Sequence, residues 1–247
     1  MRLSTASVCR EVPPLTDQQI ADQALLLLTE YGQQRQPVVR PPVPIEEILE
    51  VHLKLALEIC DLQAAYGHPD LLGAIWFKDR LVRIDQSLDP AKAPKMMGRF
   101  HFTLAHEVAH WWLHREHFAD NADPATEGMS APTFICRTSA KPRLEKQADI
   151  FAANLLMPAG LVLSAWPSWR SRPGPVYLDS LWDDYEQAIA DELALRPDGQ
   201  TPDRRVVENV VLELFSRPFA QCFEVSSEAM RIRLESLGLL IRRREPR

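Results

Sequence analysis

Residues 99–114 read RFHFTLAHEVAHWWLH, and the expected fold and site depend on this stretch. Its apolar residues recur at helical spacing, which predicts a helix over residues 95–115. The same stretch gathers most of the histidines of the chain, and histidine is a frequent metal ligand. Five of the seven lie within 17 residues, namely His101, His106, His110, His114 and His117.

His106, Glu107 and His110 form the pattern H-E-x-x-H. Residues four apart lie on one face of a helix, so the two imidazole rings can bind one metal ion. Glu107 sits beside the first ligand without occupying the metal, and it can act as a general base toward water. The alternative is a helix with two surface histidines. We disfavour it because the apolar residues fit a buried helix, whose polar groups need partners.

A third protein ligand is expected outside this stretch. The longer pattern H-E-x-x-H-x-x-G-x-x-H is absent, since Leu113 and Glu116 hold its Gly and His positions. His114 shares the face of the two ligands but lies about 12 Å along the axis from His106 in a straight helix. We therefore expect His114 to be a hydrogen-bonded or exposed histidine that can still line a cleft.

Glu145 and Asp149 lie four residues apart on a second predicted helix, over residues 142–157. Glu145 is the candidate third ligand, and Asp149 can accept a ring N–H from a ligating histidine and fix its tautomer. The alternative is a solvated pair of carboxylates, the usual case on an arbitrary helix. The upstream H-E-x-x-H favours the metal site.

Composition narrows the class of protein. The chain has 247 residues, 46% hydrophobic and 25% charged, which is typical of a folded globular protein. Its formal net charge of −6 argues against a surface that is basic throughout and binds nucleic acid. The four cysteines are scattered without a C-x-x-C pair, which indicates neither a disulfide framework nor a thiolate zinc site. No apolar run approaches a transmembrane length and no secretory signal is evident, so we expect a cytoplasmic protein.

The pattern of the whole chain predicts an α+β fold, in which a small, mostly antiparallel sheet packs on the two site helices. The other expected elements are a helix over 16–31 with a capping box at Thr16 and Gln19, a short helix after Pro44, a strand over 54–60, a hairpin over 72–77 and 81–85, an irregular loop over 117–142, an acidic helix near 178–194, and two or three helices over 204–241, with a break after residue 219.

Three segments together resemble the ImmA/IrrE family of metallo-endopeptidases. They are RFHFTLAHEVAHWWLH (99–114), FICR (134–137) and LEKQADIFAANLLMP (144–158). With the predicted elements that precede them, the resemblance spans about residues 40–160. It implies a zincin-like core of the type that adds a glutamate to H-E-x-x-H.

The resemblance also implies roles for five residues. These are His106, His110 and Glu145 as zinc ligands, Glu107 as the catalytic acid/base, and Asp149 at the Asn/Asp position of the last segment. Ala109 replaces a glycine that is usual in the family, and His101 is an additional histidine.

The implied function is that of a cytoplasmic zinc-dependent endopeptidase with one Zn²⁺ per chain, or Mn²⁺ in its place. Members of the family cleave a specific regulator, so the implied partner is a helix-turn-helix transcriptional repressor or an antitoxin, in stress response and transcription regulation. The candidates for stabilising the tetrahedral oxyanion are His114, Arg143, Tyr177 and backbone N–H groups, and His101 is a further candidate cleft residue. Cys136 is either an inhibitory or redox-sensing ligand or, as we expect, a packed loop residue.

Four segments are expected along the chain. They are an N-terminal helical segment over 1–36, a zinc metallopeptidase core over 37–165, an acidic linker or helix over 166–203, and a helix-turn-helix-like module over 204–247. In this module Ser226 is a predicted N-cap, and Arg231 and Arg233 lie on the predicted recognition helix. The alternative function is therefore a DNA-binding regulator with a metal-sensing or structural site in a peptidase-like fold. The basic surplus of the module is small, so we expect protein docking before DNA binding.

Overall fold

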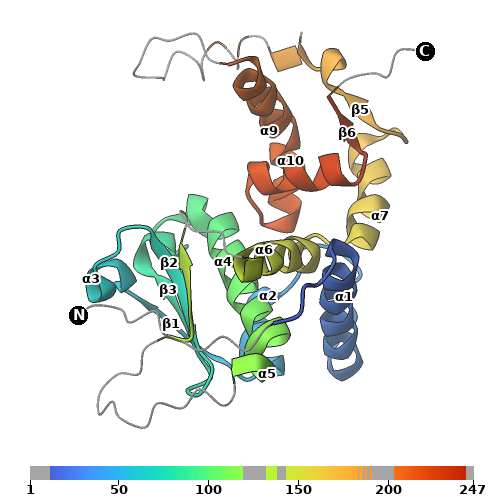
Figure 1. Cartoon of the computed structure of the whole chain (residues 1–247). Coiled ribbons are helices and arrows are strands. Elements are labelled where there is room, and N and C mark those ends of the chain that lie inside the picture. Colours follow the sequence, from blue (N-terminus) through green and yellow to red (C-terminus); the bar gives the residue numbers. More distant parts are fainter. Residues whose placement is uncertain are drawn as a thin grey trace. The chain divides into compact units, whose positions relative to one another are not determined.

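The computed structural model describes residues 12–118, 132–137, 143–182, 184, 185, 187, 190 and 203–242. The chain divides into two compact units, Met1–Pro158 and Ala159–Arg247, and each is described by itself (Figure 1). Helices form the majority, and they are combined with a small mixed sheet. The chain therefore has the mixed α+β class that the sequence predicts. The predicted limits of the four segments stay predictions, although one helix runs without a break across the limit at residues 165 and 166.

The first helix of the chain is α1, Asp17–Gln34. It begins with the predicted capping box, in which the side chain of Thr16 accepts from the backbone N–H of Gln19 and the side chain of Gln19 accepts from the backbone N–H of Thr16. The buried residues of α1 form one stripe, and α1 packs on α6, Arg143–Leu156. The N-terminal helix therefore contributes to the packing of the first unit.

Short helices connect the longer elements of the first unit. They are α2, Ile45–Glu47, with Pro44 at its N-cap; the π-helix η1, Ile48–His52; α3, Leu62–Tyr66; and the 3-10 segments η2, Gln86–Leu88, and η3, Pro94–Met96. The buried carboxylate of Asp85 accepts from two backbone N–H groups at the start of α3. This contact fixes α3 to the end of a strand.

The sheet of the first unit has four strands in the order β1-β3-β2-β4. They are β1, Ala56–Cys60; β2, Leu71–Trp76; β3, Leu81–Asp85; and β4, Phe134–Arg137. β2 and β3 form the predicted antiparallel hairpin, β4 pairs antiparallel with β2, and β1 pairs in parallel with β3. Residues 134–137 were expected in a loop. They form a strand because their backbone pairs with β2, and four residues are too few to predict such pairing from the sequence.

The predicted site helix is α4, Met97–Ala109, continued by the π-helix η4, His110–His114, and by α5, Arg115–Phe118. α4 packs on α6 and on β2 and β3. Its apolar stripe of Phe100, Leu104 and Val108 is fully buried, as the helical spacing predicts. The two helices that carry the candidate ligands therefore lie against each other, with the sheet on the other side of α4 (Figure 1).

The second unit contains α7, Ala159–Arg170; β5, Val176–Tyr177; η5, Leu178–Ser180; α9, Arg204–Phe223; α10, Ser227–Ser236; and β6, Leu240–Ile241. β5 pairs in parallel with β6, and α9 packs on α10, with Ser226 as the predicted N-cap. The acidic helix expected near 178–194 lies partly outside the described residues.

Two helices of this unit continue through a proline, which cannot donate a backbone hydrogen bond. α7 contains Pro167 and α9 contains Pro218. Of the two or three helices expected over residues 204–241, the structure has two, α9 and α10, and α9 continues through the expected break after residue 219. Phe219 and Phe223 are both buried on the helix beyond the proline. Their burial offsets the hydrogen bond that Pro218 cannot donate.

Among the described residues, no single helix is long and apolar enough to cross a bilayer, and α6 and α7 reach that length only when counted together.

Candidate metal centre

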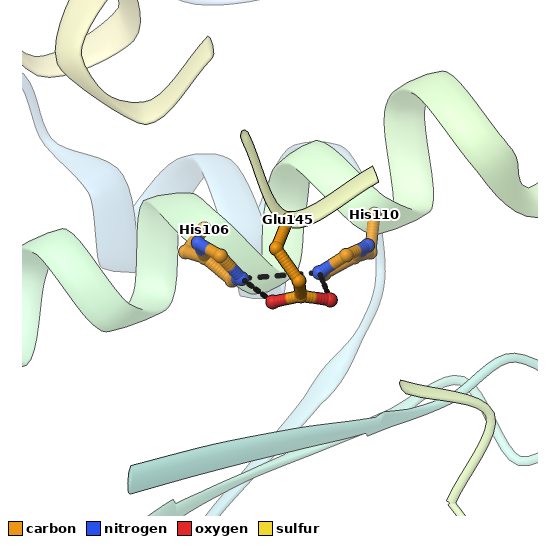
Figure 2. Close-up of side chains that lie close together, drawn as sticks. All are labelled: His106, His110 and Glu145. Carbon is orange, nitrogen blue, oxygen red and sulfur yellow. Dashed lines mark hydrogen bonds and ion pairs between the residues drawn. The ribbon is translucent and has the colours of Figure 1, made fainter. Parts of the chain in front are cut away.

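Three side chains from α4, η4 and α6 converge on one point (Figure 2). Nε2 of His106 lies 3.1 Å from Nε2 of His110 and 3.0 Å from Oε2 of Glu145. Nε2 of His110 lies 3.4 Å from Oε1 of Glu145. Both histidines are buried, and Glu145 is nearly so. The spacing of H-E-x-x-H and the packing of α6 on α4 are what bring these atoms together.

The distances between these atoms fit the ligands of a single metal ion. Ligands about 2.0–2.1 Å from a tetrahedrally coordinated ion stand about 3.3 Å from one another. The three observed distances, 3.0, 3.1 and 3.4 Å, lie close to that value. Two imidazoles and one carboxylate also make a donor set common in metalloenzymes, one that leaves a fourth position open.

The charges of the ligands suit a cation. Burial raises the pKa of Glu145, but its hydrogen bonds with His106 and His110 outweigh that effect and lower the pKa to about 2. Burial lowers the pKa of His110 to about 4. At neutral pH the group therefore presents an ionised carboxylate and a neutral His110, which are the forms that bind a metal.

Asp149 lies against the first ligand. Its Oδ1 is 3.1 Å from Nδ1 of His106, and an ionised carboxylate only accepts hydrogen bonds. Nδ1 therefore carries the proton, and Nε2 faces Glu145. Nε2 of His106 and the carboxylate of Glu145 are both acceptors, so either a proton or a metal ion must lie between them. When a metal ion binds, it takes the place of that proton.

Glu107 is the side chain of the site whose surroundings are least usual. It is fully buried, and neither carboxylate oxygen has a hydrogen-bond partner among the described residues. Burial raises its pKa to about 8, although the charge of His106 opposes this. A buried carboxylate without a partner beside three converging ligand atoms is best explained by a ligand or ion that it faces when the site is filled.

Sequence reasoning missed the residue that makes room for this carboxylate. Gly73 of β2 lies under α4, and a Cβ added to it would stand 2.7 Å from Oε1 of Glu107 and 2.7 Å from the methyl group of Thr103. A single glycine within a strand pattern is a signal of close approach, and it could have identified Gly73.

His114 is buried and lies outside the three-residue group. Its Nδ1 is 3.1 Å from Nδ1 of His110, and its Nε2 is 3.1 Å from Oε1 of Gln147 on α6. Burial lowers its pKa to about 4. His114 is thus hydrogen-bonded, one of its two expected states. No sequence signal pointed to Gln147.

The remaining candidate residues lie outside the three-residue group. His101 is buried, and its Nε2 lies 3.5 Å from Oε1 of Glu46 on α2. Arg143 donates to the backbone carbonyl of Val12. Tyr177 belongs to β5 of the second unit.

Cys136 lies in β4, and its side chain is outside the described residues, as is most of the expected loop over 117–142. Phe134 of the same strand stacks on the ring of His110, with centroids 4.2 Å apart and an interplanar angle of 15°. This contact was not expected, because no spacing in the sequence places Phe134 beside the ligands.

Comparison with known proteins agrees with this geometry. Residues 92–171 match the family model of the M78 peptidases, described as the IrrE N-terminal-like domain. The matched segment contains all three converging ligands as well as Glu107. No curated protein matches the chain significantly. The family and the group of ligands together indicate a peptidase-type function with a bound metal ion. This match of residues 92–171 to the IrrE N-terminal-like domain confirms the resemblance to the ImmA/IrrE family.

Proposed function

We propose that the chain is a zinc-dependent endopeptidase, with His106, His110 and Glu145 as the metal ligands and Glu107 as the general acid/base. One observation carries the proposal. The ligand atoms stand 3.0–3.4 Å apart, as around one ion, and the residue next to the first ligand is a buried carboxylate without a partner. A metal site with a purely structural role does not require such a carboxylate, whereas peptide hydrolysis requires a general base.

In the proposed reaction, Glu107 and Asp149 have separate roles beside the metal ion. Zn²⁺ would supply Lewis acidity, which polarises a peptide carbonyl and makes water more acidic. Glu107 takes a proton from the attacking water and delivers it to the leaving amine. Its buried position suits both tasks, because the raised pKa favours taking up the proton and a nearby cation favours releasing it. Asp149 holds His106 in the tautomer whose Nε2 can bind the metal.

The proposed substrate is a specific intracellular protein, a helix-turn-helix transcriptional repressor or an antitoxin. This part of the proposal, with a cytoplasmic location and a role in stress response, is supported by the ImmA/IrrE resemblance of residues 99–114 and 144–158. It rests on analogy, since the same fold can act on many substrates. We also propose a zincin-like core and a helix-turn-helix-like module that docks the protein substrate.

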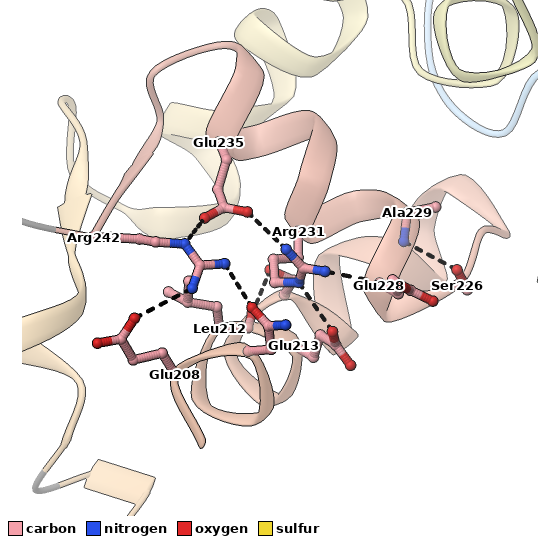
Figure 3. A network of polar contacts seen from close by, with 11 residues as sticks. Glu208, Leu212, Glu213, Ser226, Glu228, Ala229, Arg231, Glu235 and Arg242 are labelled. Carbon is pink, nitrogen blue, oxygen red and sulfur yellow. Dashed lines mark hydrogen bonds and ion pairs between the residues drawn. The ribbon is translucent and has the colours of Figure 1, made fainter. Parts of the chain in front are cut away.

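Arg231 of α10 does not support the alternative of a DNA-binding regulator. Arg231 of the predicted recognition helix is buried, and its guanidinium pairs with Glu213 at 3.0 Å and with Glu235 at 2.8 Å (Figure 3). Arg242 also pairs with Glu235 and with Glu208. These arginines hold α9, α10 and the C-terminal strand together, so their charges are already neutralised within the unit.

The deciding experiment measures metal content and proteolysis together. The purified chain should contain about one zinc ion, and it should cleave a regulator encoded beside its own gene. Glu107→Gln keeps the shape of the side chain and all three ligands, so it should retain zinc and lose cleavage. Unchanged cleavage by this variant would exclude the proposed role of Glu107, and a chain that binds no metal would exclude the proposed site.

A further inference from the structure

We propose that His114 and Gln147 form a positioning relay that holds His110 in its metal-binding tautomer. The inference rests on the proposed metal site and goes beyond it, because neither residue touches the metal position. His114 was expected only as a hydrogen-bonded or cleft residue. In the relay it acts on the second metal ligand in the way Asp149 acts on the first.

The relay is a continuous chain of short contacts. Nδ1 of His110 lies 3.1 Å from Nδ1 of His114, and Nε2 of His114 lies 3.1 Å from Oε1 of Gln147. All three side chains are buried, so water does not compete for these contacts. Each ring nitrogen of His114 therefore has one partner, and the two partners lie on opposite sides of its ring.

The direction of proton donation follows from metal binding. A metal ion on Nε2 of His110 requires that Nδ1 carry the proton, so Nδ1 donates to His114. Nδ1 of His114 then accepts, its Nε2 carries the proton, and this N–H donates to the carbonyl oxygen of Gln147. The opposite direction would leave a proton on Nε2 of His110, where the metal must bind. The amide oxygen of Gln147 at the end of the chain fits the metal-binding direction, while Nε2 of Gln147 is buried without a hydrogen-bond partner among the described residues.

The backbone places both relay residues without a loop. His110 and His114 are the first and last residues of η4, where the winding changes from α to π and shifts His114 around the helix axis. Gln147 follows the ligand Glu145 by two residues on α6. Phe134 stacks on His110 and also lies 5.8 Å from the ring of His114. The two rings are thus held between β4 and α6.

A matched pair of variants separates the relay from simple packing. Asn and Leu have nearly the same shape, and the Asn oxygen stands as many bonds from the backbone as Nδ1 of histidine. His114→Asn therefore keeps an acceptor for His110, and His114→Leu removes it. If packing alone mattered, His114→Leu would be the more stable variant, because His114→Asn buries an amide. If the relay operates, His114→Asn binds Zn²⁺ more tightly than His114→Leu, because only Asn can accept a hydrogen bond from Nδ1 of His110.

The measurement is the dissociation constant of Zn²⁺, obtained by competition with a chelator, for the full chain and each variant. His114→Leu should bind Zn²⁺ about 10–100-fold more weakly than the wild type, the usual cost of losing a group that orients a ligand. His114→Asn should retain most of the affinity, and Gln147→Met should show a smaller loss than His114→Leu. His68→Leu, a histidine substitution between α3 and β2, should leave the affinity unchanged.

Two further readouts complete the test. The absorption spectrum of the Co²⁺-loaded chain should change with His114→Leu and stay close to the wild type with His114→Asn. Thermal unfolding of the metal-free variants reports their stability. In this measurement His114→Leu should be more stable than His114→Asn, the reverse of their order in Zn²⁺ affinity. Equal Zn²⁺ affinity for His114→Leu and the wild type would overturn the relay and leave the metal site standing. A wild-type chain that binds neither Zn²⁺ nor Co²⁺ would overturn the metal site and the relay with it.

Discussion

Gly73 leaves open the space that the carboxylate of Glu107 fills, since a Cβ on Gly73 would lie only 2.7 Å from Oε1. The strand and the helix can approach this closely only because residue 73 has no side chain. The buried acid is thus held on one side by the sheet and on the other by its own helix. This contact ties the proposed general acid/base to the fold independently of the three proposed metal ligands.

Gly73→Ala should therefore reduce peptidase activity more than metal binding. The added methyl overlaps both Glu107 and Thr103, so β2 or α4 must shift, at a cost of about 1–3 kcal/mol in unfolding free energy. Peptide cleavage and zinc stoichiometry, measured on the same sample, check this. Gly160→Ala is the matched control, because its Cβ meets nothing within 4 Å. Full activity in Gly73→Ala would contradict the role given to this contact.

Glu107→Gln should lower the cleavage rate about 10²–10⁴-fold, the usual contribution of a general acid/base. The amide can neither take up the proton of water nor return it. Zinc content should stay at the wild-type level, because the three ligand atoms do not change. Steady-state cleavage of the regulator, normalised to bound zinc, measures the effect. Loss of zinc in this variant would point instead to Glu107 as a ligand.

Asp149→Asn should weaken Zn²⁺ binding about 10–100-fold. The amide can present its NH₂ to Nδ1 of His106, and His106 then places its own proton on Nε2, where the metal binds. Competition with a chelator gives the affinity. Lys146→Gln, an exposed change on the same helix, serves as the control and should have no effect. Wild-type affinity in Asp149→Asn would show that His106 needs no partner to fix its tautomer.

The metal-free chain should lose stability as pH rises from 6.5 to 8. Burial raises the pKa of folded Glu107 from 4.5 to about 8, so in this range the folded chain keeps a proton that the unfolded chain has lost. Stability therefore falls with rising pH, by about 2 kcal/mol over these 1.5 pH units. His110 and His114, whose folded pKa values are lowered to about 4, act in the opposite direction, mainly below about pH 7, and offset part of this fall. Urea unfolding with a chelator present should show the fall, and Glu107→Gln should abolish it.

Arg231→Met should destabilise the second unit by about 1–3 kcal/mol, because it leaves two carboxylates without their shared partner. Methionine keeps the length and apolar part of the side chain, so the change reports mainly the lost charge. Arg205→Met on exposed α9 surface is the control and should lie within about 0.5 kcal/mol of the wild type. Duplex DNA binding that depends on Arg231 while stability stays unchanged would favour the DNA-binding alternative.

The sequence could predict the elements whose signals are local. The site helices, the β2–β3 hairpin and the capping box of α1 follow from spacing and from single residues such as Thr16. The convergence of His106, His110 and Glu145 could be anticipated as well, because it requires only two helical faces and one contact between helices.

The contacts that complete the site could not be predicted, because each depends on tertiary packing. Gln147 and Phe134 carry no chemical signature, and they matter only through the rings that they touch. The π winding after Ala109 leaves no mark in the pattern of apolar residues. In the second unit, α9 continues beyond the expected break after residue 219, where Phe223 is buried.

α6 brings Glu145, Gln147 and Asp149 to the histidine helix within five residues, and its own packing joins α4 to α1. Metal binding and the packing of α6 on its neighbours are therefore thermodynamically coupled, so each stabilises the other. Zinc at 100 times its dissociation constant would add about 2.7 kcal/mol to the stability of the folded unit. A fall in the supply of metal would then loosen α6 from both of its neighbours, and the enzyme would become a substrate for other proteases as it lost its own activity.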